Sequence, residues 1–307
     1  MTFLRGFEGW PSGELHLAIG VFDGVHVGHR VVLERLLRGA RAARATTVVA
    51  TFDPLPARFF NPTDGPLALT EVEHRTRLLH EAGADAVAVF DFDAAFAALT
   101  PDEFAGRLAA AGALRRVVVG LDFHFGHDRA GAARTLDALG ARHGFRVEVV
   151  APHSIDAAVV SATSIRGLLA EGDLAQAATL LGRPFDIGGV VVRGAGRGTK
   201  LGWPTLNIAT SPLLQLPRDG IYAGWIEVLA ARYPAALSLG VRPTFGAGHK
   251  RILEAHLINW SGDLYGSRVH TTFVRRLRDE LRFDSVEALK KQIALDVKLA
   301  SAVLEGA

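Results

Sequence analysis

Apolar residues in the first half of the chain follow two alternating periods. Every second position from 15 to 21 is apolar, which predicts a strand, and the apolar spacing from position 32 to 40 predicts a helix after it. The alternation continues to about residue 180, with further strands predicted at 46–52, 86–90, 116–120 and 146–150. Because these strands are rich in valine and separated by helices, the pattern predicts a doubly wound parallel α/β sheet.

Two helices in this half carry start signals. Thr70 with Glu73, and Thr100 with Glu103, each place a hydroxyl three residues before a carboxylate. This is the spacing of a capping box, in which the two side chains bond to the first free backbone N–H groups of a helix. We therefore expect helices to start at both threonines.

The pattern changes near residue 183. Apolar runs at 188–192, 221–228, 235–239, 252–258 and 268–274 follow one another with little helix between them, which predicts a small antiparallel β-barrel. Asp284 with Glu287 predicts the start of a last helix, whose apolar stripe would pack on the barrel. The stripe consists of Val286, Leu289, Ile293, Val297 and Ala300. We expect two domains, residues 1–182 and residues 183–307.

Composition excludes several function classes. The chain has 307 residues and a formal charge of +2. It contains no cysteine, and this rules out disulfides, thiolate metal sites and cysteine nucleophiles. No lysine precedes Lys200, so the first half cannot contain a P-loop, whose lysine binds phosphate. No stretch approaches the roughly 20 apolar residues of a membrane-spanning helix. We expect a cytoplasmic protein without a membrane or nucleic-acid partner.

The first candidate site lies where the first strand turns into the first helix. Residues 20–29, GVFDGVHVGH, place His26 and His29 near the helix start and Gly20, Gly24 and Gly28 on the turn. Glycines let backbone N–H groups approach an anion, and a helix N-terminus favours negative charge. Both imidazoles can donate hydrogen bonds to phosphate oxygens in a transition state. We interpret the turn as a nucleotide-phosphate site; the alternative is a polar turn with two surface histidines.

A second candidate site opens the barrel domain. Residues 194–207 read GAGRGTKLGWPTLN, in which glycine backbones can surround a polyphosphate. Arg197 and Lys200 supply countercharge, and Thr205 and Asn207 offer hard oxygen ligands for Mg²⁺. The alternative interpretation is a basic β-hairpin tip.

Seven motifs, in the same order, resemble those of the bacterial bifunctional riboflavin kinase/FAD synthetase (FMN adenylyltransferase) family over essentially the whole chain. They lie at residues 20–29, 49–56, 118–126, 161–166, 202–207, 240–245 and 253–257. The resemblance implies that the second domain phosphorylates riboflavin with ATP to give FMN and ADP. It implies that the first domain then transfers AMP from a second ATP to FMN, giving FAD and pyrophosphate.

In the first domain, the resemblance implies that His26 and His29 stabilise charge during adenylyl transfer. The family's ATP and phosphate contacts fall on Gly20, Phe22, Asp23, Gly24, Gly28, Thr163 and Arg166, and its flavin contacts on Asp122, Phe123 and Phe125. For Arg166, an ordinary helix-surface charge is the alternative.

In the second domain, the resemblance implies that Glu254 accepts the hydroxyl proton of riboflavin as general base. The family's Mg²⁺ ligands fall on Thr205 and Asn207, its ATP contacts on Gly196, Arg197, Gly198 and Lys200, and a flavin contact on Arg242. Because residues 252–258 alternate, the alternative for Glu254 is a solvent-facing strand carboxylate.

One departure from the family pattern keeps other functions open. Ala162 stands where the family motif has a second serine, which removes one hydroxyl from the phosphate loop. The main expectation is a bifunctional enzyme, a monomer or weak homo-oligomer, that uses Mg²⁺ and ATP. The alternatives are a riboflavin kinase with weak or lost adenylyltransferase, a non-catalytic flavin-binding regulator, and a nucleotidylyltransferase with another substrate.

Overall fold

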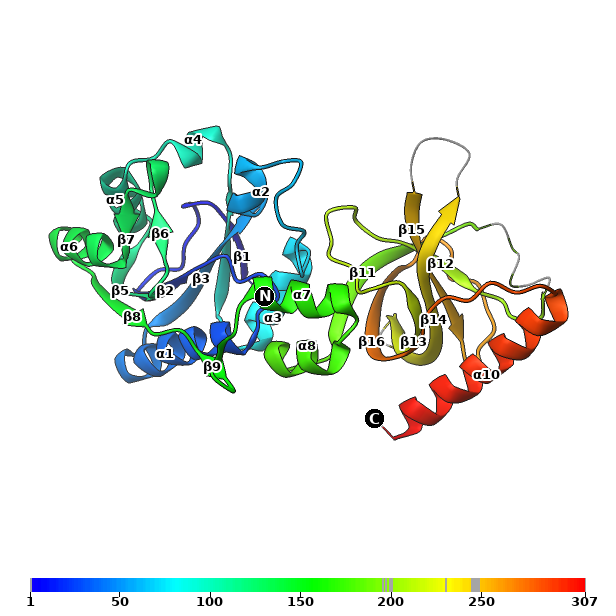
Figure 1. The fold of residues 1–307 in the computed structure, drawn as a ribbon. Helices are drawn as coiled ribbons and strands as arrows, with labels where there is room; N and C mark the ends of the chain where they lie inside the picture. The colour runs from blue at the N-terminus through cyan, green and yellow to red at the C-terminus, as the bar shows by residue number, and fades with distance from the viewer. Residues whose placement is uncertain are drawn as a thin grey trace. The chain divides into compact units, whose positions relative to one another are not determined.

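The computed structural model describes residues 2–194, 196, 198, 201–229, 231–243 and 249–306. The chain forms two compact units, Met1–Ala162 and Thr163–Ala307 (Figure 1). The first unit contains an α/β sheet and the second a β-barrel, so the predicted fold class is confirmed in both halves.

Six parallel strands form the sheet of the first unit, which is described without a gap from residue 2 to residue 162. They are β1 (Thr2–Arg5), β2 (Glu14–Ile19), β3 (Thr46–Asp53), β4 (Ala86–Asp91), β5 (Ala113–Gly120) and β8 (Arg146–Val150). Their order is β1-β4-β3-β2-β5-β8, and each neighbouring pair is parallel. The chain builds the sheet outward from β2 in both directions, so the switch point lies beside β2. Ligands of such sheets bind at the carboxyl ends of the strands at this point.

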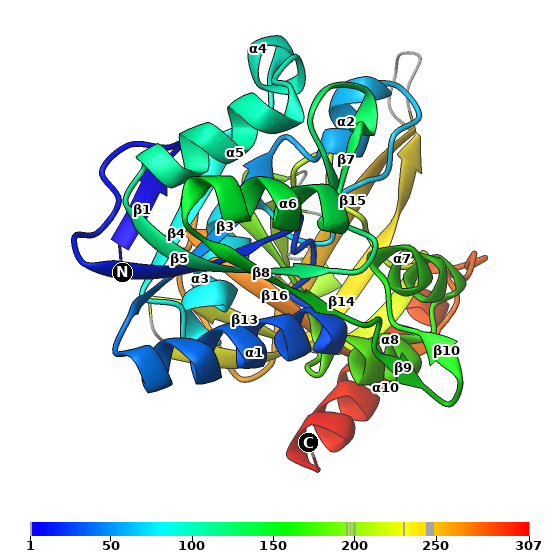
Figure 2. The same ribbon diagram turned by 90° about the vertical axis from the view of Figure 1, so that its left-hand side faces the viewer.

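Helices cover both faces of the sheet (Figure 2). On one face, α1 (Val27–Ala43) and α3 (Val72–Glu81) share an apolar core with the sheet, in which Leu36 and Leu79 lie with Val49. On the other face, α5 (Pro101–Ala110) and α6 (Ala133–His143) do the same, with Phe104 and Leu17 in the core. Burying both faces explains why the central strands are continuously apolar.

The connections of the first unit contain shorter elements. They are α2 (Pro56–Phe60), α4 (Ala94–Ala97), β6 (His124–Phe125), the 3₁₀ turn η1 (His127–Arg129), β7 (Gly131–Ala132), β9 (Ser154–Ile155) and β10 (Ala158–Val159). The last four strands form two antiparallel pairs, β6 with β7 and β9 with β10.

Of the two predicted capping boxes, only that at Thr100 forms. The Thr100 hydroxyl accepts a hydrogen bond from the Glu103 N–H (3.3 Å), and the Glu103 carboxylate accepts one from the Thr100 N–H (2.8 Å). The box predicted at Thr70 is wrong, because α3 has Glu71 as its N-cap and no side-chain cap hydrogen bond at its start. The Thr70 hydroxyl instead accepts a hydrogen bond from the Gly24 N–H (3.1 Å). A tertiary contact has replaced the local cap.

In the second unit, two helices, α7 (Ala162–Glu171) and α8 (Leu174–Leu181), precede a closed barrel made of six described strands. The strands are β11 (Phe185–Val192), β12 (Leu206–Ala209), β13 (Gly220–Val228), β14 (Ala231–Pro243), β15 (His249–Leu257) and β16 (Arg268–Arg278). Their order around the barrel is β11-β12-β15-β14-β13-β16, with every pair antiparallel. The predicted antiparallel barrel is confirmed; the four-residue β12 is an addition, since its segment was interpreted as part of a loop.

The barrel is filled by alternate residues of its strands. Tyr222, Leu237 and Ala255 are direct neighbours on β13, β14 and β15, and each is at most 1% exposed. Because side chains alternate along a strand, the residues between them point to the outer face of the barrel.

A long terminal helix, α10 (Val286–Glu305), packs on the outside of the barrel through Ala300 and Leu304. Its N-cap is Ser285, whose hydroxyl accepts from the Ala288 N–H (3.1 Å), and not the predicted Asp284. Val286 is 51% exposed and therefore does not belong to the packed stripe.

We predict that Asp296→Ala loosens α10 from the barrel. Asp296 is 4% exposed and accepts hydrogen bonds from Arg278 Nε of β16 (2.8 Å) and from Gln292 (2.9 Å). Its removal leaves a largely buried guanidinium without its carboxylate, so the free energy of unfolding should fall by about 3 kcal/mol in urea titrations. The control Lys298→Ala, on an exposed residue of the same helix, should stay within about 0.5 kcal/mol. A loss for Asp296→Ala no larger than that of the control would contradict this reading of the pair.

Candidate active sites

The turn between β2 and α1 has an unusual backbone. Phe22, Gly24 and Val25 all have positive φ, of 50°, 81° and 42°. Glycine adopts this region freely, but a bulky or β-branched residue there costs about 1–3 kcal/mol. Phe22 and Val25 are 1% and 2% exposed in the core under α1, and burial of such side chains contributes about 1.5–3 kcal/mol each. Burial therefore only balances the strain, and the turn depends on further contacts.

Asp23 supplies some of these contacts. It is 2% exposed, and its carboxylate accepts hydrogen bonds from the backbone N–H groups of Leu69 (2.8 Å) and Thr70 (3.1 Å). The Thr70 hydroxyl in turn accepts from the Gly24 N–H. Asp23 thus anchors the turn to the segment before α3. Its sequence-based role in ATP binding stays a prediction.

A buried arginine lies under the same turn. Arg75 of α3 is 1% exposed, and its Nη1 donates to the Val21 carbonyl (3.2 Å), the Thr51 hydroxyl (3.0 Å) and the Phe52 carbonyl (2.9 Å). Its Nη2 donates to the Thr70 carbonyl (3.3 Å). Burial lowers the pKa of Arg75, while the carboxylates of Asp23 and Asp53 raise it. Arg75 is not predicted as a site residue, because nothing in the sequence distinguishes it from a surface arginine of a helix.

The two histidines meet at the start of α1. His26 is the N-cap, and its Nδ1 accepts a hydrogen bond from the His29 N–H (3.3 Å). The rings stack, with centroids 3.5 Å apart and an interplanar angle of 17°. A Cβ at Gly28 would lie 3.2 Å from the His26 ring, so the lack of a side chain at Gly28 leaves space for this ring. The predicted strand-to-helix turn with both imidazoles at a helix N-terminus is therefore present.

Burial lowers the pKa of His29 well below its usual range, and the neighbouring His26 and Arg75 lower it further. The ring touches Phe22 edge-on, with centroids 5.1 Å apart. Its Nδ1 is buried without a hydrogen-bond partner among the described residues. We assign the proton of the neutral ring to Nε2, because a buried N–H without an acceptor would be costly.

The proposed flavin residues of the first unit lie at the end of β5. The rings of Phe123 and Phe125 stack, with centroids 5.6 Å apart, and Asp122 beside them is exposed. Ring contacts of at most 5.9 Å between centroids lead from Phe125 through neighbouring phenylalanines to Phe60 of α2, which is 66% exposed. Phe60 is not among the predicted site residues; its signal in the sequence is an aromatic pair, Phe59 and Phe60, shortly after the motif at residues 49–56.

Thr163 and Arg166 lie in the first turns of α7 and belong to the second unit. His26 belongs to the first unit. Thr163 is exposed and Arg166 half-buried. Ala162 is the first residue of α7. Contacts of Thr163 and Arg166 with ATP stay predictions.

In the barrel, strand register brings three polar residues into one row. Asn207 of β12 is the direct partner of Glu254 of β15, which is the direct partner of Ser238 of β14. Direct partners in antiparallel strands point to the same side, here the outer face, and all three side chains are half-buried. Asn207 and Glu254, 47 residues apart in the sequence, thus lie side by side.

The glycine-rich loop packs on this row. A Cβ at Gly194 would lie 2.1 Å from the Asn207 amide nitrogen, and one at Gly198 would lie 3.0 Å from the Thr205 hydroxyl. Only glycine allows such an approach of backbone to side chain. His256 Nδ1 donates to the Pro204 carbonyl (2.8 Å), and its ring contacts Trp203 edge-on. His256 is a positioning residue without a role in the sequence analysis, although it lies two residues after Glu254 on the same strand face.

Some predicted residues fall outside this description. Arg197 and Lys200 lie outside the described residues, as does the side chain of Arg242, whose backbone belongs to β14. Gly196 is described, with a φ of 64°.

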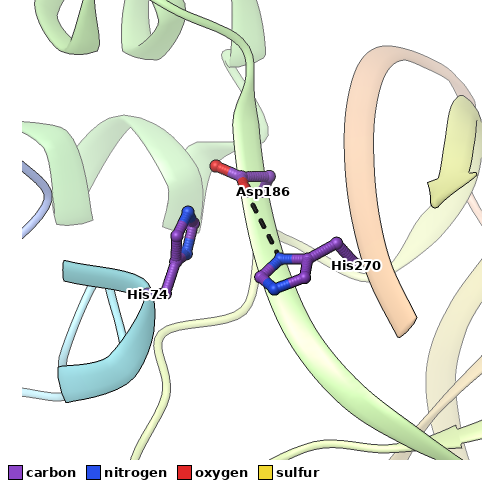
Figure 3. A group of neighbouring side chains, drawn as sticks. All are labelled: His74, Asp186 and His270. Carbon is purple, nitrogen blue, oxygen red and sulfur yellow. Dashed lines mark ion pairs between the residues drawn. The ribbon is translucent and has the colours of Figure 1, made fainter. Parts of the chain in front are cut away.

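A further charged cluster in the barrel wall had no sequence signal. Asp186 of β11 forms an ion pair with His270 of β16, with Oδ2 and Nδ1 3.8 Å apart (Figure 3). Arg183 Nε lies 3.5 Å from the same carboxylate. The cluster joins β11 to β16, whereas the row at Glu254 lies on β12, β15 and β14.

Two family models match separate parts of the chain. The family model of FAD synthetase matches residues 11–164, and that of riboflavin kinase matches residues 181–304. Within the described residues, no helix has the length and apolar composition needed to cross a bilayer.

Relatives match across nearly the whole chain. The bifunctional riboflavin kinase/FMN adenylyltransferase of Pseudomonas fluorescens is 37% identical over 93% of this chain and 91% of its own. That of Escherichia coli K12 is 37% identical over 96% of both. A crystal structure from Streptococcus pneumoniae, described as a macrolide-efflux protein, has a TM-score of 0.88 and 30% identity, covering 98% of this chain and 99% of that one. With both domain models matched in sequence order and two relatives 37% identical over 93% and 96% of the chain, the chain belongs to the bifunctional riboflavin kinase/FMN adenylyltransferase family.

Proposed function

We propose that the chain makes FAD from riboflavin in two ATP-consuming steps, with riboflavin phosphorylation in residues 183–307 and FMN adenylylation in residues 1–182. The observation that carries the proposal is the pairing of Asn207 with Glu254, which puts a metal-type ligand beside a candidate general base. Riboflavin, FMN, FAD, ATP, ADP and pyrophosphate are its only partners in this scheme. We place both steps in the cytoplasm, where ATP is available.

In the kinase step, the 5′-hydroxyl oxygen of riboflavin attacks the γ-phosphorus of ATP, and ADP leaves. Glu254 accepts the hydroxyl proton as that bond forms. Its place on a strand, with neighbours on both sides, fixes the backbone that carries the carboxylate. Arg197 and Lys200 offset the charge of the phosphates, since phosphoryl transfer depends mainly on positioning and electrostatics.

Mg²⁺ fits the residues beside this base. The Thr205 hydroxyl and the Asn207 amide oxygen are hard ligands, and the backbone at Gly194 and Gly198 comes close to these two side chains. When bound, the ion would neutralise charge on the phosphates.

In the adenylyl-transfer step, a phosphate oxygen of FMN attacks the α-phosphorus of ATP, and pyrophosphate leaves. No covalent enzyme intermediate is needed, so the chain's part is to align the reactants and stabilise charge. The neutral His29 donates from Nε2, and the N-terminus of α1 adds its unpaired N–H groups. The exposed ring of Phe60 and the half-buried ring of Phe123, which stacks on the buried Phe125, offer apolar surface to the planar flavin.

A second candidate function is a riboflavin kinase with a weakened adenylyltransferase. Ala162 favours it, because the first residue of α7 lacks the hydroxyl of the family motif.

Chromatography of FMN and FAD over time separates the candidates. We expect the purified chain with riboflavin and Mg-ATP to form FMN first and FAD afterwards, and to form FAD directly from supplied FMN. FMN without FAD would favour the weakened enzyme, and turnover of neither flavin would overturn the proposal.

We predict that Glu254→Gln stops FMN formation but leaves FAD formation from supplied FMN intact. Loss of the proton acceptor should reduce kinase kcat by about 10²–10⁴-fold. The matched control is Glu227→Gln, on the exposed side of β13, which should behave as wild type. Equal loss of both activities would refute separate sites.

His29→Ala should have the opposite effect, with FMN accumulating and FAD formation from FMN falling by about 100-fold or more. His127→Ala, on an exposed histidine of the same unit, serves as the control. Unchanged FAD output from His29→Ala would remove His29 from the mechanism.

The lowered pKa of His29 also predicts a pH dependence of stability. Below the ordinary pKa of 6.5 the unfolded chain takes up a proton that the folded chain excludes, so the free energy of unfolding should fall as the pH falls from about 7 to 5. His16, whose pKa is lowered mainly by burial, adds a slope of the same sign. We therefore expect His29→Gln to reduce the slope without abolishing it in thermal melts. A slope equal to that of the wild type would show that His29 titrates normally in the folded chain.

A further inference from the structure

We propose that Arg75 is a positioning residue for adenylyl transfer: its buried guanidinium holds the turn that presents His26 and His29. The inference rests on the proposed FMN adenylyltransferase function of the first unit. Arg75 lies outside all seven motifs of the sequence analysis.

The guanidinium joins three segments that the turn needs. It bonds to the carbonyl of Val21, at the entry of the turn, and to Thr51 and Phe52, at the end of the neighbouring strand β3. It also bonds to the carbonyl of Thr70, in the segment that anchors Asp23. The Thr51 hydroxyl donates to the same Val21 carbonyl (2.7 Å), so the contacts form one network. Only a side chain with several donors in a rigid fork can bridge such a set.

The turn requires this support because of its backbone. Phe22 and Val25 hold positive φ values that relaxed L-residues avoid, and strain of this kind persists only where the surroundings fix it. A turn released from Val21 and Thr70 can relax at Phe22 and Val25, which displaces the N-cap residue His26. Displacement of a catalytic group by about 1 Å can cost about 100-fold in rate.

Arg75 also sets the charge around the site. The groups that face it are the carboxylates of Asp23, on the turn, and Asp53, at the end of β3. Those that face His29 are His26 on the turn and Arg75 on α3, and both disfavour a second proton on the His29 ring. The same residue therefore fixes the backbone of the turn and helps to keep His29 a neutral donor.

Three variants separate positioning from simple stability. Arg75→Met keeps the length of the chain but has neither charge nor donors, Arg75→Gln keeps donors without the charge, and Arg75→Lys keeps the charge and three donors. Arg77→Gln is the matched control, because Arg77 lies on the same helix and pairs with the exposed Glu81 (3.6 Å). Riboflavin phosphorylation by the second unit is an internal control in every sample.

The experiment measures kcat and KM for FAD formation from FMN, together with an NMR titration of the His29 ring, in the full chain. We expect Arg75→Met to lower kcat by about 10- to 100-fold with little change in KM, and to raise the pKa of His29. The kcat of Arg75→Lys should be about tenfold higher than that of Arg75→Met, and the pKa of its His29 should stay low. Kinase activity should stay at the wild-type level in all variants.

Two results would overturn the inference. One is an Arg75→Met enzyme with kcat within about threefold of wild type. The other is an equal loss in Arg75→Met and Arg75→Lys with the same His29 titration in both, which would mean that Arg75 acts on folding alone. If Arg75→Met does not fold, the comparison of Arg75→Gln with Arg75→Lys decides by the same criteria. A wild-type chain that makes no FAD from FMN would refute the proposed function, whereas the histidine titration would still report on Arg75.

Discussion

The first site depends on the tether between a strained turn and the polar groups buried beneath it. Phe22 and Val25 can hold positive φ only because their side chains are buried and because Asp23 and Arg75 fix the backbone around them. This places the helix start, and with it both imidazoles, at the carboxyl end of β2, beside the point where the sheet reverses its direction of growth. A site held by rigid elements in this way needs little reorganisation when charge develops.

The second site is built by a different constraint, the register of a closed barrel. Each strand of the barrel pairs with two neighbours. Because side chains alternate along a strand, a slip of one residue in register would turn every side chain of the strand to the other face. The apolar interior fixes the register, since Tyr222, Leu237 and Ala255 must point inward together. Asn207, Glu254 and Ser238 then line up on the outer face. The chemistry of the kinase half thus follows from the packing of its core.

The sequence predicted those features that depend on neighbours in the chain. The period of the apolar residues gave the parallel sheet and the barrel, and the capping box at Thr100 formed because both its partners are local. The box at Thr70 failed because a residue 46 positions away, Gly24, bonds to the same hydroxyl. The burial of Arg75 and the pairing of Asn207 with Glu254 could not be predicted from the sequence for the same reason. Burial of one arginine among many, and the register of two strands, are set only when distant segments pack.

The most direct test of the account is whether the histidine pair binds phosphate. The side-chain ¹⁵N signals of His26 and His29 can be followed by NMR while pyrophosphate, the product of adenylyl transfer, is added to the full chain with Mg²⁺. His16, near the start of β2 and so at the far end of that strand from the turn, is the internal reference. The account predicts that the signals of His26 and His29 shift in a saturable manner while that of His16 stays. Signals of His26 and His29 that do not move at pyrophosphate concentrations that inhibit FAD formation would contradict it.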